Sequence, residues 1–328
     1  MHRWYKTVMA TLLLMVLTQG GALAQGAADT YPSRPIMTII PFAAGGSYDR
    51  EFQFYSPKLA QFLGKPFVVD FKPGAANTIG AGYVARSRPD GYTLLAVSTS
   101  LTIAQALIPN LSFDLTRDFA PVTLINKSVP ILVAHSGFGP RDFREYLAYV
   151  RENPGKVNLG TSGQGGSGHL ASAWLHSMAK AKVTFIHYKG AGPQLLDLAA
   201  GRVDVTVVNL FGSLPLIKAG KIRPIANLDE ARTKNMPDLP TVAEQGLPDF
   251  SFYNWLGIAA PGGTPPRIVS RLSEAFAAVV RMPEVAGPIE AQGVEMLGSP
   301  PERLRSLMTV EIERWRKVAR DNGIQAEN

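Results

Sequence analysis

Short apolar runs alternate with longer helical segments along the chain, and this alternation restricts the possible fold more than any other feature. Strands separated by helices usually pair in parallel, because the chain returns along each helix before it starts the next strand. The first set of elements therefore predicts a parallel sheet with helices on its faces. Its strands are expected at 37–40, 67–70 and 93–97, and its helices at 48–63 and 78–86.

The same alternation restarts after Pro121. Strands are expected at 130–134, 157–160, 183–187 and 203–208, with helices at 142–152, 169–178 and 194–200. A C-terminal return adds a strand near 255–259 and helices at 266–280 and 301–322. Two α/β sets predict two lobes, each a mostly parallel sheet flanked by helices, with a ligand cleft between them. We expect lobe 1 at 25–125 plus 252–328, and lobe 2 at 126–251.

The first 24 residues are typical of a secretory signal peptide. His2, Arg3 and Lys6 precede an apolar run at 8–17, and Ala22-Leu23-Ala24 supplies a cleavage pattern of small residues. A helix of that apolar length rises only about 15 Å, half of a bilayer core. We therefore expect cleavage after Ala24 and export to the periplasm.

The chain has no cysteine, so the exported protein can form no disulfide and has no thiol to carry a lipid anchor. A chain of 328 residues can bury a hydrophobic core large enough to supply the stability instead. The net charge of +7 falls to +5 without Arg3 and Lys6. For an exported protein this charge favours weak attraction of anionic ligands, and we expect no nucleic-acid partner.

Two glycine-rich junctions, each between a strand and a helix, suggest the function. The first spans 41–49 and includes Gly46; the second spans 160–169 and includes Gly163. Backbone N–H groups at a helix start lack partners, the helix dipole favours negative charge there, and glycine lets an anion approach closely. Two such junctions in corresponding places indicate a carboxylate site, although ordinary tight turns remain the alternative. Hydroxyls come from Ser47, Thr161, Ser162 and Ser167.

The second junction does not fit a dinucleotide site, a hydrolase motif or a metal site. Gly163, Gly165 and Gly168 match G-x-G-x-x-G, but no acidic residue lies between Glu152 and Asp197, where a dinucleotide site needs one. His169 replaces the last glycine of a G-x-S-x-G motif. No carboxylate cluster accompanies the histidines of the following helix. We therefore expect no enzyme activity, no cofactor and no metal.

Eight short motifs follow one another along the chain: YPSRP at 31–35, PFAAGG at 41–46, KPGA at 72–75, PDGYTL at 89–94, YKG at 188–190, GRVD at 201–204, LPTVAE at 239–244 and WLGIAAP at 255–261. Through these motifs, in this order, nearly all of the mature chain resembles the substrate-binding proteins of tripartite tricarboxylate transporters, the Bug family. The resemblance implies a periplasmic binding protein fold (type II-like) that closes on its ligand. It also implies a monomeric receptor that passes a small organic carboxylate to membrane permease subunits; the alternative is a ligand sensor for a signalling partner.

The resemblance also implies which residues bind the carboxylate, through backbone amides, hydroxyls and bridging waters. The chain departs from the family pattern at Tyr48, at Phe71-Lys72 and at Asn209, where an acid is common. A neutral Asn209 favours a plain mono- or dicarboxylate over an amino acid, since an amide pairs an ammonium group weakly. The residues implied are Phe42, Ala44, Ser47 and Asp49 in lobe 1, Ser98 and Thr99 at a strand end, and Ser162, Gly163, His169 and Asn209 in lobe 2.

Overall fold

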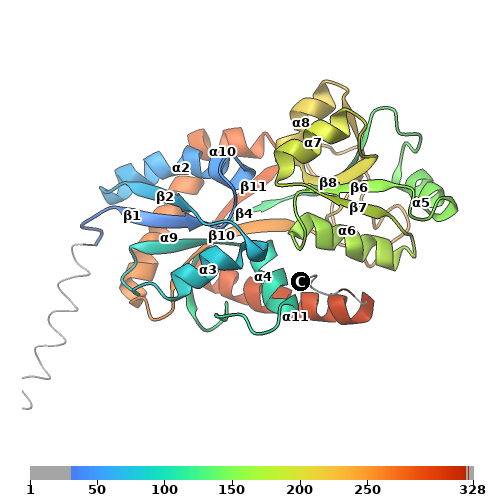
Figure 1. Ribbon diagram of the computed structural model, residues 1–328. Helices are drawn as coiled ribbons and strands as arrows, with labels where there is room; N and C mark the ends of the chain where they lie inside the picture. The colour runs from blue at the N-terminus through green and yellow to red at the C-terminus, as the bar shows by residue number, and fades with distance from the viewer. Residues whose placement is uncertain (1–30, 323, 325–328) are drawn as a thin grey trace, which may run out of the picture.

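The computed structural model describes residues 31–322 and residue 324, so the predicted signal peptide lies outside the described residues. Two α/β lobes lie side by side (Figure 1). No helix in the described part of the chain is long and apolar enough to cross a membrane.

Lobe 1 is built on a six-stranded sheet in the order β11-β4-β10-β3-β1-β2. The strands β1, β2 and β3 are parallel, whereas β10 pairs with β3 and β4, and β11 with β4, in antiparallel fashion. The strands are β1 (Ile36–Ile40), β2 (Phe67–Phe71), β3 (Thr93–Ser98), β4 (Phe119–Ser128), β10 (Asn254–Pro261) and β11 (Val294–Ser299). The helices are α2 (Ser47–Leu63), the 3₁₀ turn η1 (Ala75–Asn77), α3 (Thr78–Ala85), α4 (Thr99–Leu107), α9 (Pro266–Val280), α10 (Pro283–Glu290) and α11 (Pro301–Asn322).

Lobe 2 is built on a five-stranded sheet in the order β7-β6-β8-β5-β9. Here β6, β7 and β8 are parallel, and β5 pairs with β8 and β9 in antiparallel fashion. The strands are β5 (Pro130–His135), β6 (Asn158–Thr161), β7 (Thr184–His187), β8 (Val205–Asn209) and β9 (Ile222–Asn227). The helices are α5 (Phe143–Glu152), α6 (Ser167–Met178), α7 (Ala191–Ala199) and α8 (Leu210–Lys218).

The prediction of a two-lobed α/β fold is confirmed, but both sheets are mixed rather than mostly parallel. The antiparallel pairing that makes the sheets mixed involves the strands along which the chain passes between the lobes. It leaves lobe 1 along β4 and enters lobe 2 along β5, and it returns from β9 into β10. The crossing strands run antiparallel to their neighbours: β4 pairs with β10 and β11, and β5 pairs with β8 and β9.

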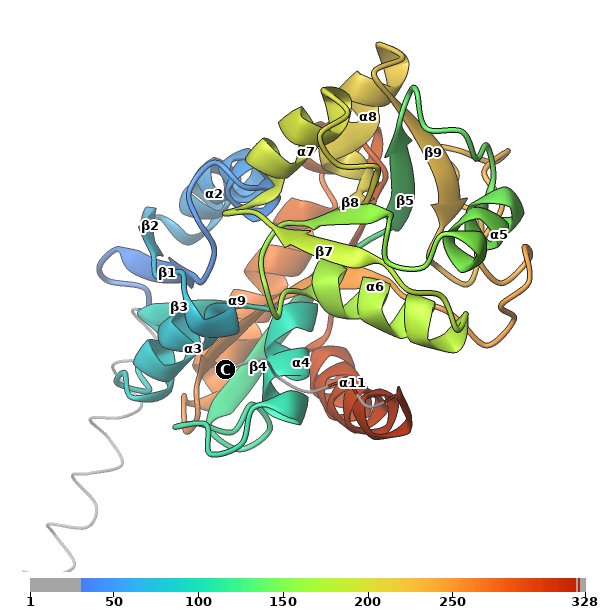
Figure 2. The same cartoon turned by 45° about the vertical axis from the view of Figure 1, so that its right-hand side comes forward.

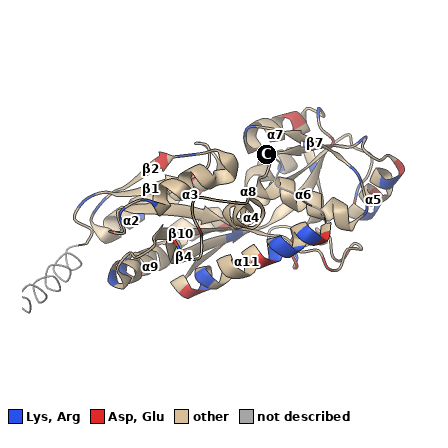
Figure 3. Ribbon diagram, turned by 60° about the horizontal axis from the view of Figure 1, so that its bottom comes forward, with Lys and Arg blue, Asp and Glu red and all other residues tan. Residues whose placement is uncertain are grey.

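The long helix α11 spans both lobes. It packs along α4 and β4 of lobe 1 and reaches α6 of lobe 2, where the rings of Trp315 and Trp174 lie 5.8 Å apart. Figure 1 shows α11 beneath both lobes, and Figure 3 shows charged residues of both signs along its outer side. In the same figure α3, α4 and α6 carry no Lys, Arg, Asp or Glu.

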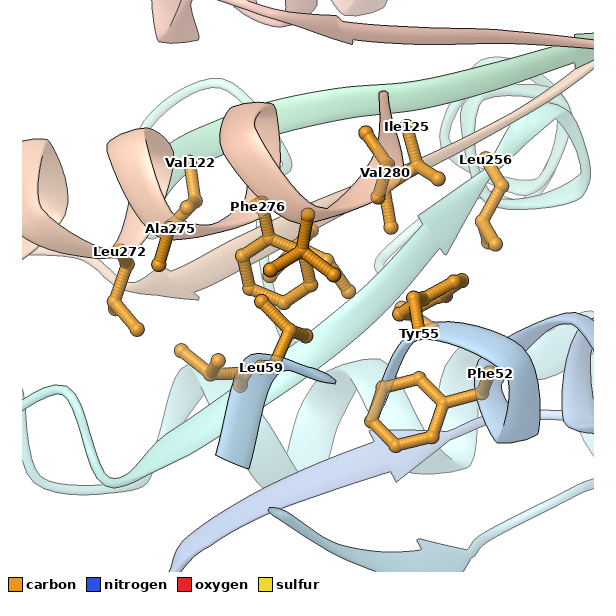
Figure 4. Packing of buried hydrophobic residues seen from close by; sticks show 14 of the residues in the cluster. Phe52, Tyr55, Leu59, Val122, Ile125, Leu256, Leu272, Ala275, Phe276 and Val280 are labelled. Atoms are coloured by element: carbon orange, nitrogen blue, oxygen red, sulfur yellow. The ribbon is translucent and has the colours of Figure 1, made fainter. Parts of the chain in front are cut away.

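Apolar packing fixes the position of α2 on lobe 1. Phe52, Tyr55 and Leu59 recur at helical spacing and are at most 2% exposed. The ring of Tyr55 lies 6.3 Å from that of Phe276 on α9. Figure 4 shows both side chains in the same apolar cluster. Burial of each such side chain contributes roughly 1.5–3 kcal/mol, so the start of α2 is held on a rigid support.

Candidate functional site

The carboxyl ends of β1–β3 in lobe 1 and of β6–β8 in lobe 2 face each other, and we call them the facing edges (Figures 1 and 2). Close contacts between the lobes join these edges. Phe211, at the start of α8 in lobe 2, belongs to the apolar core of lobe 1 and is 5% exposed. The side chain of Leu210 fills the space beside Gly293 of lobe 1. A Cβ at Gly165 would lie 3.7 Å from the Cβ of Ala76. The glycine-rich junctions therefore lie at the boundary between the lobes.

Six helices begin just after these strand ends, and their first turns share an electrostatic property. None of α2, α3, α4, α6, α7 and α8 has a side-chain hydrogen bond from its N-cap residue, and only α2 has an acid in its first turn, Asp49. Elsewhere, Asp142 caps α5 and Glu145 follows it, α10 and α11 have Glu284 and Glu302 in their first turns, and α9 has neither a side-chain cap nor an acid. The facing edges therefore gather positive helix ends with N–H groups that no side chain caps.

The first junction turns sharply into α2. Gly45 has φ +77°, a left-handed conformation that favours glycine, and Gly46 is the N-cap residue. The carboxylate of Asp49 accepts hydrogen bonds from the N–H of Gly45 at 2.8 Å and from Gln53 at 3.1 Å. The Asp49 carboxylate is thereby held against its own loop.

Three further residues of this junction were predicted as ligand contacts. Phe42 is half-buried, and its ring lies 4.5 Å from the ring of Tyr48. Ala44 is exposed. Ser47 is the first residue of α2, and its side chain is outside the described part of the structure. Ala43, Ala44 and Gly45 are exposed, so they are the accessible part of this loop.

The second junction is shaped by glycine and by His169. Gly163 has φ +154° and Gly165 φ +70°, and Gly166 is the N-cap residue of α6. His169 is 7% exposed, and its Nδ1 accepts a hydrogen bond from the N–H of Gly165 at 3.2 Å. Through this hydrogen bond the ring of His169 is held within its own loop. Ser162, in contrast, is exposed at the start of the loop.

Buried polar groups lie where β3, β8 and β10 meet. Thr99 Oγ1 accepts from the backbone N–H of Trp255 at 3.0 Å, and Asn254 Nδ2 donates to Asn209 Oδ1 at 2.8 Å. Ser98 Oγ and Asn254 Oδ1 are buried and have no hydrogen-bond partner among the described residues. A buried polar atom without a partner costs about 1–3 kcal/mol, so these two groups favour a polar ligand or water beside them.

One buried carboxyl adjoins the first junction. Glu51 lies one turn into α2, is 2% exposed, and accepts a hydrogen bond from Asn126 Nδ2 at 2.5 Å. Burial raises the pKa of Glu51 to about 8, since a charged carboxylate is poorly solvated there. The group is therefore mainly neutral at pH 7 and does not oppose an anion at the start of α2.

Comparison with known proteins agrees with this geometry. Residues 53–324 match the family described as "Tripartite tricarboxylate transporter family receptor". The chain belongs to this family. The receptor is 32% identical to protein BugT of Bordetella pertussis over 318 residues, which cover 96% of this chain and 97% of BugT.

Two solved structures of Rhodopseudomonas palustris proteins are also similar to the receptor. One, with adipate, is 32% identical with a TM-score of 0.84, covering 90% of this chain and 99% of that one. The other, MatC with bound malate, is 30% identical with a TM-score of 0.82, covering 88% and 99%. The family consists of periplasmic solute-binding receptors, so the receptor is not an enzyme, as predicted, and its location is periplasmic.

The structure brings residues from both predicted junctions to the facing edges and adds two that the sequence did not indicate. Asn254 was missed because only the folded β10 places it beside Asn209. Arg50 was missed because it follows the junction motif, yet its side chain reaches α8 of the other lobe. No local motif marks either residue.

Proposed function

We propose that this receptor binds a small organic carboxylate between its lobes and delivers it to the permease subunits of a tripartite tricarboxylate-type transporter. The observation that carries the proposal is the set of six helix starts at the facing edges, which lack side-chain caps and, apart from Asp49, acids. Such ends attract anions through their N–H groups and their dipoles.

A site built in this way gives useful affinity without a dedicated ion pair. Hydrogen bonds to a charged group contribute roughly 1.5–3 kcal/mol each, and three or four of them offset much of the cost of association. In this proposal the backbone near Gly46 and Gly163 provides the principal donors, and Ser98 and Asn209 lie beside them. Closure of the lobes removes water and strengthens each bond.

The ligand class follows from the relatives and from charge. Two similar structures contain adipate and malate, which are both dicarboxylates. Asn209 is neutral and is already bonded to Asn254, so this strand end has no carboxylate to pair a ligand ammonium group. We therefore propose a mono- or dicarboxylate, aliphatic or aromatic, rather than an amino acid.

A screen of the mature receptor against organic acids tests the proposal. Adipate, malate, succinate and benzoate, with the uncharged amide of each as a matched control, would be compared by thermal shift and then by calorimetry. We expect at least one acid to raise the melting temperature while its amide does not. Binding of amides as tight as that of acids, or turnover of any acid, would contradict the proposal.

A further inference from the structure

Arg50 bridges the two lobes. It lies in the first turn of α2 in lobe 1, and its guanidinium carbon is 5.4 Å from the centre of the Phe211 ring at the start of α8 in lobe 2. One guanidinium nitrogen lies 4.0 Å from where a Cβ at Gly212 would stand. A cation in the helical turn next to the first junction thus points across the boundary.

Among the described residues this cation forms no ion pair, and the carboxyl that it influences, the buried Glu51, has its pKa raised by burial and lowered only in part by Arg50. Lys72 pairs with Asp70 at 2.9 Å and Lys127 with Asp229 at 2.8 Å, so two other cations near the boundary are already neutralised. Arg50 forms no such ion pair within residues 31–322, and α6, α7 and α8, which begin opposite it, have no acid in their first turns. Its protein contact is an aromatic ring, and stacking on a ring leaves guanidinium N–H donors available.

We propose that Arg50 binds the second carboxylate of a dicarboxylate whose first carboxylate lies at the glycine-rich junctions. The inference rests on the proposed carboxylate site and narrows its ligand class. The planar guanidinium presents paired donors that match a carboxylate, and Phe211 limits the positions that the side chain can take. Arg50 is therefore the residue that distinguishes a dicarboxylate from the monocarboxylate of the same length.

A purely mechanical role makes a different prediction. If the contact with Phe211 only stabilised closure, loss of Arg50 would weaken every ligand by the same factor. A role in recognition changes the ratio of affinities for a diacid and its matched monoacid. That ratio is therefore the informative measurement.

Three length-matched pairs provide the ratio by calorimetry: adipate with hexanoate, succinate with butyrate, and malate with 3-hydroxybutyrate. The variants are Arg50→Gln, Arg50→Lys and Lys189→Gln, since Lys189 is an exposed cation on the loop before α7. Arg34→Gln is the matched control. Arg34 also lies over a ring, 4.1 Å from Tyr92, but it pairs with Asp90 just before β1, at the amino ends of the parallel strands.

We expect the unmodified receptor to prefer at least one diacid over its monoacid by about tenfold or more, the scale of one charge-assisted contact. Arg50→Gln should bring the ratio of diacid to monoacid affinity close to one and should change the monoacid affinity little. Arg50→Lys should retain part of the preference for the diacid, and Arg34→Gln should retain all of it.

Three results would overturn the inference and leave a carboxylate receptor intact: no preference for any diacid in the unmodified protein, equal weakening of both members of a pair by Arg50→Gln, or loss of the preference only in Lys189→Gln. Failure of the unmodified receptor to bind any acid of either kind would overturn the proposed function as well.

Discussion

Replacement of Glu51 by glutamine tests whether the buried carboxyl of α2 is neutral in the folded receptor. Asn126 Nδ2 donates to one Glu51 oxygen, while Asn126 Oδ1 is buried without a partner among the described residues. A protonated carboxyl carries a hydrogen-bond donor that a carboxylate lacks. Glutamine has nearly the same shape, likewise carries a donor and an acceptor, and does not titrate.

The sign of the pH dependence follows from the raised pKa. Burial moves the pKa of Glu51 from 4.5 to about 8. Between these values the unfolded chain is ionised and the folded protein is not, so unfolding releases a proton. The free energy of unfolding should therefore fall by up to about 1.4 kcal/mol for each pH unit. This contribution is complete below pH 4.5, is lost as the pH rises, and changes no further above about pH 8.

Glu51→Gln should remove this dependence. We expect the variant and the unmodified receptor to be similarly stable near pH 4.5, and the variant to be more stable by about 3–5 kcal/mol near pH 9. Urea unfolding followed by circular dichroism at about pH 5, 7 and 9 measures the difference, and other titrating groups cancel in the comparison.

Glu284→Gln is the control for this experiment. Glu284 is exposed, and its own backbone amide and Lys58 lower its pKa, so its loss should produce no such divergence. Parallel stability curves for Glu51→Gln and the unmodified receptor from pH 5 to 9 would refute a neutral Glu51.

The remaining predictions concern the junctions, the strand end and processing. Gly163→Val should weaken adipate binding at least about tenfold in calorimetry, because a branched side chain at the second junction blocks the approach of the anion to the backbone. Gly155→Val introduces similar backbone strain, at φ +76° in the loop before β6, but lies outside the junctions and should leave the affinity unchanged; equal effects would argue against the loop assignment. Asn209→Asp keeps an acceptor for Asn254 but adds negative charge, so adipate affinity should fall about tenfold, and unchanged affinity would remove this residue from the site. N-terminal sequencing of the periplasmic protein should begin at Gln25, and an intact leader in the membrane fraction would contradict the predicted cleavage.

The long amphipathic elements were predictable from the sequence alone. The expected helices at 266–280 and 301–322 have the observed bounds of α9 and α11, because their apolar spacing continues over many turns. The elements that were missed include β4, β9 and α8, which contain Pro121, Pro224 and Pro215. Proline interrupts a local pattern, and only pairing with neighbouring strands or packing makes these segments regular.

The candidate site was predictable where it is local. Each glycine-rich junction is a continuous segment whose turn and helix start follow from its own residues. Contacts between distant residues were not predictable, such as Arg50 with Phe211 or Asn209 with Asn254, since they require the two lobes to be placed together. His169 was predicted as a ligand contact, and the structure adds that its Nδ1 is bonded within its own loop.

A crystal structure of the receptor with a bound dicarboxylate such as adipate would show directly which atoms hold the ligand. We predict carboxylate oxygens within about 3.2 Å of backbone nitrogens at both junctions, around Gly46 and Gly163, with the second carboxylate at Arg50. This prediction would be contradicted by a ligand held only by lysine side chains. It would equally be contradicted by a ligand in the groove of about 310 Å³ between α6 and β7, which Ala173, Val183 and Phe185 help to line.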